Sequence, residues 1–183
     1  MTSAPISTAA RMLPLRLPRV CVALASANPS DMLSKAESLV RDNSLLEFRL
    51  DYISQPTSAL PKIKHFLEVH PSAVVIGTCR RAVNGGKFRG SVASQLEILG
   101  KAASAGCQLL DLELQSAADA KRGTVERLRS KASVILSYHD FRGTKKLDDV
   151  LQSIATLYPA GTLSTLPAVS VGVVASPAAA AKP

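Results

Sequence analysis

From Arg19 onward, short apolar runs alternate with longer stretches in which apolar residues recur at helical spacing. Five apolar runs predict strands at about residues 20–25, 44–51, 73–79, 108–114 and 132–138. Helices are predicted after them, at about residues 28–41, 57–70, 91–105, 116–130 and 145–157. Strands that alternate with helices of this length are typical of parallel βαβ units. The pattern therefore predicts an α/β fold with a parallel sheet.

Polar residues interrupt the apolar pattern of the second predicted strand. Alternation along Leu45–Tyr52 puts Glu47, Arg49 and Asp51 on one face of this strand. Three charges on one inward face are costly to bury unless they neutralise one another or meet a polar ligand. We keep both interpretations, an ion pair between Glu47 and Arg49 within the strand and a ligand site.

The next three predicted strands also end in polar residues. Arg80 and Arg81 follow the third strand, Asp111 and Glu113 alternate along the fourth, and His139 ends the fifth. In parallel α/β proteins, ligands and catalytic groups gather at the carboxyl ends of the strands. A histidine there can transfer protons near neutral pH. The alternatives are a solvated arginine pair and a histidine that only caps the next helix.

Four motifs together resemble the type I 3-dehydroquinate dehydratases in order and spacing, over about residues 19–160. They are Glu47–Asp51, Thr78–Arg81 with Gly85–Gly86, Asp111–Leu114 and Ser137–Phe141. The resemblance implies a (β/α)8 TIM barrel and a lyase that dehydrates 3-dehydroquinate to 3-dehydroshikimate in the shikimate pathway of aromatic amino acid biosynthesis. It also implies that neither a metal nor an organic cofactor takes part. In this family a lysine forms a Schiff base with the substrate ketone, and a histidine transfers the protons.

The resemblance assigns a role to each matching residue. His139 matches the general acid and base of the family. Glu47, Arg49 and Arg80 match substrate-binding positions, and Asp111 and Glu113 match an acidic motif that supports the site. For Asn84, which precedes Gly85–Gly86, we expect a turn without ligand contact, because Asn and Gly supply positive φ angles.

The number of predicted units departs from the family. A complete barrel takes about 250 residues, and only five βα units are predicted, with Val169–Val174 as a candidate sixth strand. The resemblance places the imine-forming lysine a few residues beyond Ala160, yet no lysine occurs between Lys146 and Lys182. We therefore expect a truncated barrel with impaired activity. The alternative is a non-catalytic fragment that acts only as a binding or interaction module.

The two ends of the chain differ in composition from its middle. Residues 1–18 contain no acidic residue and are expected to form a disordered leader. Residues 19–160 carry the partial barrel, and residues 161–183 form an atypical tail rich in Ala, Pro and Val.

Composition and charge change this picture little. The chain has 22 Lys and Arg against 14 Asp and Glu, a net charge of +8. The charges are dispersed, so we expect no nucleic-acid partner. The carboxylate substrate that the resemblance implies would benefit from the positive field of the chain. The sequence contains no apolar segment long enough to predict a membrane span.

Cys21, Cys79 and Cys107 lack paired or metal-binding spacing, which favours reduced core thiols in a cytoplasmic protein. The resemblance also implies a homodimer or a fusion to shikimate dehydrogenase in the intact protein.

Overall fold

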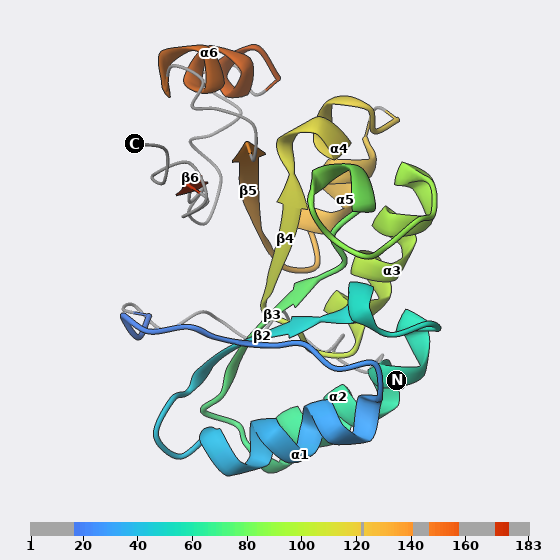
Figure 1. Ribbon diagram of the computed structural model, residues 1–183, viewed down its shortest axis with the longest axis vertical. Coiled ribbons are helices and arrows are strands. Elements are labelled where there is room, and N and C mark those ends of the chain that lie inside the picture. Colours follow the sequence, from blue (N-terminus) through green and yellow to red (C-terminus); the bar gives the residue numbers. More distant parts are fainter. Residues whose placement is uncertain (1–16, 122, 141–146, 158–170, 176–183) are drawn as a thin grey trace, which may run out of the picture.

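The computed structural model describes residues 17–121, 123–140, 147–157 and 171–175. Six parallel strands form one sheet in the order β1-β2-β3-β4-β5-β6 (Figure 1). The strands are β1 (Val22–Leu24), β2 (Leu45–Arg49), β3 (Val74–Thr78), β4 (Leu109–Glu113), β5 (Ser133–Asp140) and β6 (Val171–Ala175). The α-helices are α1 (Pro29–Leu39), α2 (Leu60–Val69), α3 (Val92–Ser104), α4 (Leu114–Ala118), α5 (Thr124–Arg129) and α6 (Leu147–Leu157). Spatial order equals chain order, as expected for consecutive βα units.

One face of the sheet packs against helices, and we call it the outer face. In Figure 1, α1 and α2 lie below the curved sheet, and α3, α4 and α5 lie along its right side. Phe48 of β2, Val75 of β3 and Leu110 of β4 are fully buried in one core cluster with residues of these helices. Phe48 meets Phe66 of α2 edge-to-face, with ring centroids 5.7 Å apart. The main hydrophobic core therefore lies between the sheet and the helices.

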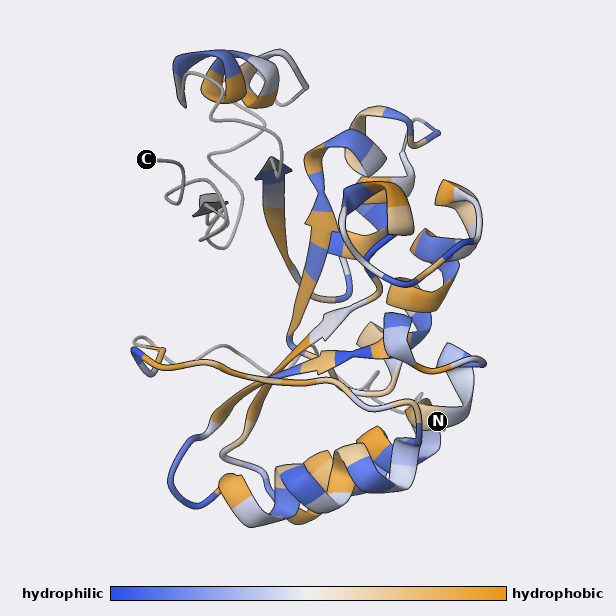
Figure 2. Ribbon diagram, in the orientation of Figure 1, coloured by the Kyte–Doolittle hydropathy of each residue, from blue (hydrophilic) through white to orange (hydrophobic). Residues whose placement is uncertain are grey.

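The opposite face, which we call the inner face, carries the alternate residues of each strand. Near the amino ends of the strands, Leu45, Val74 and Leu109 form a second, smaller apolar cluster with Ile76 and Ile135. Toward the carboxyl ends, the same alternation brings polar residues onto this face. Figure 2 shows the change in colour along β4 and at the tip of β5. The inner face thus has an apolar floor below a polar rim.

The end of β2 differs from the sequence prediction, which continued this strand to Asp51. The strand ends at Arg49, and Leu50–Tyr52 form a 3-10 helix, η1. The Asp51 carboxylate accepts hydrogen bonds from the Arg49 side chain and from the backbone N–H of Lys87. Asp51 therefore reaches Arg49 by a turn of the backbone, and strand alternation does not describe its position.

The predicted helix at residues 116–130 is also wrong, because two short helices, α4 and α5, occupy this region. Gly123 precedes α5 with a φ of 79°, a left-handed conformation that glycine adopts readily. The predicted sixth strand is observed at Val171–Ala175, paired in parallel with β5. The predicted leader lies outside the described residues except for its last two positions, and Lys182 lies outside them too.

Two further features bear on the sequence predictions. Cys79 and Cys107 are buried as expected, but Cys21 is exposed, so its prediction as a core thiol is wrong. Cys21 directly precedes β1, a strand of three residues at the edge of the described sheet, of which only Leu24 is buried. Among the described helices, none is both long enough and apolar enough to pass through a bilayer.

Candidate active site

The polar rim gathers residues from the carboxyl ends of β2, β3, β4 and β5. Its side chains are Glu47, Arg49, Thr78, Arg80, Asp111, Glu113, Ser137 and His139, which follow the inner-face alternation of these strands. The register aligns Thr78 with both Arg49 and Asp111, and Glu113 with Ser137. All six residues predicted for the site therefore lie on one face of one sheet.

Arg49 is held by a bidentate ion pair with Asp51. Its Nε donates to Asp51 Oδ1 at 2.9 Å, and its Nη2 donates to Asp51 Oδ2 at 2.8 Å. The guanidinium carbon also lies 5.0 Å from the centre of the Tyr52 ring. Among the described residues, Asp51 is the ion-pair partner of Arg49, so the pairing considered with Glu47 is not found. Glu47 remains half-buried on the same face.

Arg80 links the end of β3 to the acids of β4. Its Nη2 donates to Asp111 Oδ2 at 2.6 Å, and its Nε lies 4.0 Å from Glu113 Oε1. The side chains are 14% exposed for Arg80, 8% for Asp111 and 1% for Glu113. Burying the two carboxylates removes their hydration, which costs much free energy. The positive charge of Arg80 beside them offsets part of this cost.

A tight loop after β3 holds the Arg80 backbone. The Phe88 N–H donates to the Arg80 carbonyl at 3.0 Å, and Gly85 turns the chain with a φ of 81°. A Cβ on Gly86 would lie 2.1 Å from the Arg80 carbonyl oxygen, so only glycine fits there. Asn84 in this loop is 8% exposed, and its Nδ2 makes no hydrogen bond within the described part of the chain. The predicted turn is present.

Glu113 is held from the opposite side by Gln95 of α3. Gln95 is fully buried and donates from Nε2 to Glu113 Oε2 at 2.6 Å and to the Cys79 carbonyl at 3.0 Å. The Arg81 N–H donates to Glu113 Oε1 at 3.1 Å. Burial raises the pKa of Glu113, and these donors oppose the rise. The sequence analysis missed Gln95, although an amide on the buried face of an amphipathic helix is a signal that could have found it.

His139 lies near the end of β5. Burial lowers its pKa, and the positive charges of Arg80 and Arg49 lower it further, while the carboxylate of Asp111 raises it. The imidazole is therefore mostly neutral near pH 7 and can accept a proton. The dependence on these three charges also places His139 within electrostatic reach of both ion pairs.

Several buried polar atoms on this face have no hydrogen-bond partner among the described residues. They include Thr78 Oγ1, Arg80 Nε, Asp111 Oδ1 and Ser137 Oγ. Buried polar atoms are normally hydrogen-bonded, so a set of unsatisfied donors and acceptors on one rim is typical of a site that receives a polar ligand. Within the described residues, no three His, Cys, Asp or Glu side chains are grouped so as to hold a metal ion.

A family model and similar curated proteins point to one family. A family model described as type I 3-dehydroquinase matches residues 20–161. The 3-dehydroquinate dehydratase of Coxiella burnetii is 29% identical over 136 residues, 74% of this chain and 55% of that protein. The Desulfotalea psychrophila 3-dehydroquinate dehydratase is 32% identical over 144 residues, 78% of this chain and 61% of that protein. The chain thus spans little more than half the length of these relatives.

Solved structures show the same fold. The type I 3-dehydroquinate dehydratase of Clostridium difficile, with covalently modified comenic acid, aligns with a TM-score of 0.66 and 20% identity. The alignment covers 86% of this chain and 63% of that one. The S. pombe protein with dehydroquinate dehydratase and shikimate dehydrogenase aligns with a TM-score of 0.57 and 20% identity, covering 79% of this chain and 29% of that one. The fold prediction, a part of the (β/α)8-barrel family, is confirmed.

A first prediction concerns the titration of His139. Arg80→Met removes a cation and leaves Asp111 unpaired, so the pKa of His139 should rise. Asp111→Asn removes the anion, so the same pKa should fall. NMR of the imidazole Cε1 proton measures both shifts, and Lys64→Met on α2 serves as a distant control. Shifts of the same sign in the two variants would contradict this electrostatic arrangement.

A second prediction concerns Gln95. Gln95→Leu leaves Glu113 Oε2 and the Cys79 carbonyl without their buried donor. Losing such a donor costs about 1–3 kcal/mol of unfolding free energy. Urea denaturation followed by circular dichroism measures the loss, with Gln115→Leu at an exposed position of α4 as the matched control. Equal midpoints for the two variants would show that Gln95 does not hold Glu113.

Proposed function

The chain belongs to the type I 3-dehydroquinase family, and we propose from this premise that its inner face binds 3-dehydroquinate for dehydration to 3-dehydroshikimate. The relatives named 3-dehydroquinate dehydratase are hydro-lyases of the shikimate pathway. This chain covers 55% and 61% of the two relatives, so the activity, the substrate and the partners are proposed for it.

The unsatisfied polar rim carries this proposal. The substrate has one carboxylate, one ketone and several hydroxyl groups, and it therefore needs both cations and hydrogen-bonding partners. Arg49 and Arg80 supply fixed cations. Thr78 Oγ1, Ser137 Oγ and Asp111 Oδ1 make no hydrogen bond with any described residue and can bond to a ligand. A small polyhydroxylated acid matches this set better than an apolar ligand.

Each predicted residue keeps its role within the proposal. Glu47 and Arg49 hold substrate hydroxyls, and Arg80 binds the substrate from the end of β3. Asp111 and Glu113 support the site by fixing Arg80, to which Asp111 is hydrogen-bonded. These roles follow from family membership and from the position of each residue on the rim.

His139 acts as the general acid and base. Its lowered pKa leaves the imidazole neutral, so it can remove the proton next to the substrate ketone and return a proton to the leaving hydroxyl. Such a group contributes roughly 10²–10⁴-fold to a rate. The remaining acceleration in this chemistry comes from a protonated imine, which draws electrons from the carbanion.

The imine requires an amine, and the sequence limits where one can come from. No lysine lies between Lys146 and Lys182, the stretch in which the family has its Schiff-base lysine. The described rim therefore supplies the binding and proton-transfer groups, and we propose low turnover for the chain. The absent lysine also favours a second candidate function, a non-catalytic binding module, which shares the binding step and differs in having no turnover.

For the intact protein, we propose a cytoplasmic enzyme without a metal or organic cofactor. A homodimer and a fusion to shikimate dehydrogenase are both proposed arrangements. The S. pombe structure supports the second, because it combines the two activities in one protein.

A third prediction tests the rim as a substrate site. Thr78→Val removes a buried hydroxyl that has no partner among the described residues, so the free protein should be as stable as the original or more stable. Binding of 3-dehydroquinate should weaken about two- to tenfold, as for the loss of one hydrogen bond. Isothermal titration calorimetry measures the affinity, and Thr57→Val at an exposed position is the control. Unchanged affinity in Thr78→Val would remove Thr78 from the site.

A fourth prediction separates binding from catalysis. After incubation with 3-dehydroquinate and borohydride, mass spectrometry should find no stoichiometric adduct, because trapping needs an amine held beside the ketone. Among the described residues, Lys87 is the amine near the rim that the experiment must examine. Its backbone N–H donates to Asp51, and its side-chain Nζ lies 6.0 Å from the centre of the Tyr52 ring. An adduct on Lys87 would show that the rim has its own amine, and the proposed low turnover would then be wrong.

A further inference from the structure

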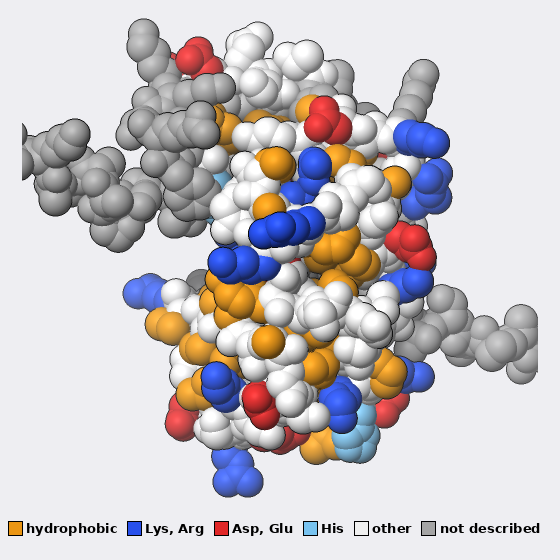
Figure 3. All heavy atoms as spheres, turned by 45° about the vertical axis from the view of Figure 1, so that its right-hand side comes forward, with side chains coloured by type: hydrophobic (Ala, Val, Ile, Leu, Met, Phe, Trp, Pro, Cys, Tyr) orange, Lys and Arg blue, Asp and Glu red, His pale blue; other side chains and the backbone are white. Residues whose placement is uncertain are grey.

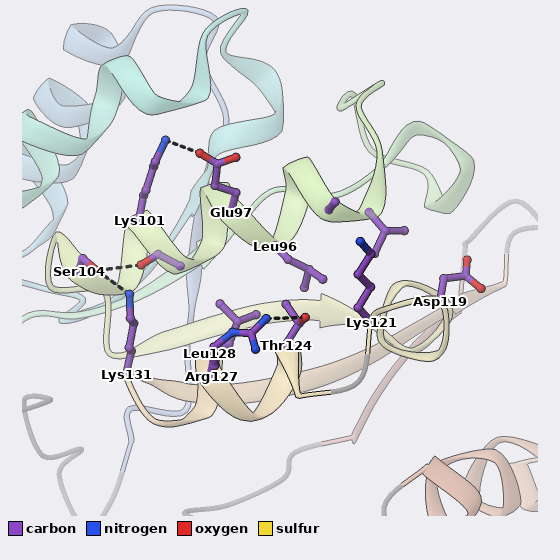
Figure 4. A pocket seen from close by; sticks show the side chains of 13 residues that line it. Leu96, Glu97, Lys101, Ser104, Asp119, Lys121, Thr124, Arg127, Leu128 and Lys131 are labelled. Atoms are coloured by element: carbon purple, nitrogen blue, oxygen red, sulfur yellow. Dashed lines mark hydrogen bonds and ion pairs between the residues drawn. The ribbon is translucent and has the colours of Figure 1, made fainter.

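A recess on the outside of the molecule has no role in the proposed reaction. It lies between α3 and the segment from Asp119 to Lys131 that contains α5, and its volume is about 580 Å³. Pockets that enclose small ligands have roughly 300–1,000 Å³. We call it the α3–α5 recess (Figure 4).

The floor of the recess is apolar. Leu96 and Leu128 line it and are each 4% exposed, so most of each side chain is fixed in the core. Gly100 of α3 also lines it, and a Cβ at this position would lie 3.4 Å from Leu128 Cδ2. The absence of a side chain at Gly100 leaves space above Leu128. An apolar floor of this kind suits a ring or an aliphatic body.

Basic side chains surround this floor. Lys101, Lys121, Arg127 and Lys131 line the recess, against the acids Glu97 and Asp119. Figure 3, turned toward this side of the molecule, shows basic side chains beside exposed hydrophobic atoms. With four cations and two acids, the lining has an excess of positive charge.

Only one of these cations is neutralised by an acid within the described residues. Lys101 pairs with Glu97 at 2.7 Å. Arg127 donates to the hydroxyl of Thr124 at 2.9 Å and Lys131 to the hydroxyl of Ser104 at 3.3 Å, and both hydroxyls are uncharged (Figure 4). Like charges repel one another around a recess with an apolar base, and an anion placed there would reduce this repulsion.

The recess is separate from the candidate active site. Leu96 and Gly100 face it from α3, whereas Gln95 of the same helix contacts Glu113 of the inner-face rim. The sheet lies between the two sites, because α3 packs on its outer face. A ligand in the recess would therefore not contact the residues of the candidate active site.

We propose that the α3–α5 recess is a second binding site for a small organic anion with an apolar body, such as an aromatic carboxylate. The apolar body lies on Leu96 and Leu128, and the anionic group meets Arg127 and Lys131. An inorganic anion would leave the apolar floor unused, and a neutral aromatic compound would leave the cations uncompensated. The combination of both features selects this chemical class.

The probe for this site is 2-naphthoate, titrated into the full ¹⁵N-labelled chain and followed by NMR. We expect saturable shifts of the Leu96, Gly100 and Leu128 amides, while the amides of Asp111 and Glu113 stay in place. The uncharged 2-naphthamide should bind at least about fivefold more weakly, because it cannot pair with the cations.

Two variants test the two halves of the site. Arg127→Gln with Lys131→Gln removes the charges and should weaken 2-naphthoate binding at least about fivefold. Its control is Lys35→Gln with Lys64→Gln, an equal change of charge at exposed positions of α1 and α2. Ala93→Trp fills the recess from an exposed lining position and should abolish the shifts without opening the core.

Four outcomes would overturn the proposal, and three of them concern 2-naphthoate. These three are equal binding of naphthoate and naphthamide, an equal loss in the control pair, and unchanged binding in Ala93→Trp. An acidic peptide that binds the recess and is not displaced by 2-naphthoate would identify a protein partner and would also contradict the small-molecule site.

Discussion

The candidate active site depends on the burial of two carboxylates, Asp111 and Glu113, two residues apart on β4. Both face the inner side of the sheet and both are more than nine-tenths buried. Without compensation, such a pair would have to bind a proton or move apart, because each ion loses its hydration and repels the other. Arg80 compensates Asp111, and Gln95 together with the Arg81 N–H compensates Glu113. These contacts tie α3 and the loop after β3 to the end of β4.

The same network adds to the effect of burial on the pKa of His139. A buried imidazole near one carboxylate alone would tend to gain a proton, but the two arginines act against this. Arg49 and Arg80 stay near His139 because each has an acid of its own, Asp51 or Asp111. Burial lowers the pKa of His139 most, and the two arginines lower it further, so the imidazole has the neutral form that a general base needs. Charge balance links the fold of the rim to its chemistry.

The sequence could predict the inner face because it follows from a period of two residues. Alternation predicted that Glu47 and Arg49 share one face of the second strand and that Asp111 and Glu113 share one face of the fourth, and the structure places all four on the inner face. Alternation requires a strand, and it failed at Asp51, where the chain turns into a 3-10 helix. Contacts between distant segments leave no periodic signal.

Two features of the site depend on contact partners that a sequence pattern does not identify. The need for glycine at position 86 arises from the Arg80 carbonyl oxygen, which a Cβ would approach to 2.1 Å. The role of Gln95 arises from Glu113 on another element. Each depends on a distance between segments that fold against each other, whereas helical spacing reports only that a position is buried. The break between α4 and α5 is similar, since a glycine within a helical pattern can be tolerated or can end the helix.

Helix α3 shows how one element can serve two sites without joining them. Consecutive helical residues point about 100° apart, because a turn takes 3.6 residues. Gln95 therefore faces the sheet and holds Glu113, while Leu96 lines the outer recess. Gly77 of β3 brings the sheet close to this helix, since a Cβ there would lie 3.3 Å from the Ala102 Cβ. A chain packed this tightly has little room to alter one face of α3 by sliding the helix. Side-chain changes on the recess face can thus be made while the Gln95–Glu113 contact is kept, which makes the two sites separable by mutation.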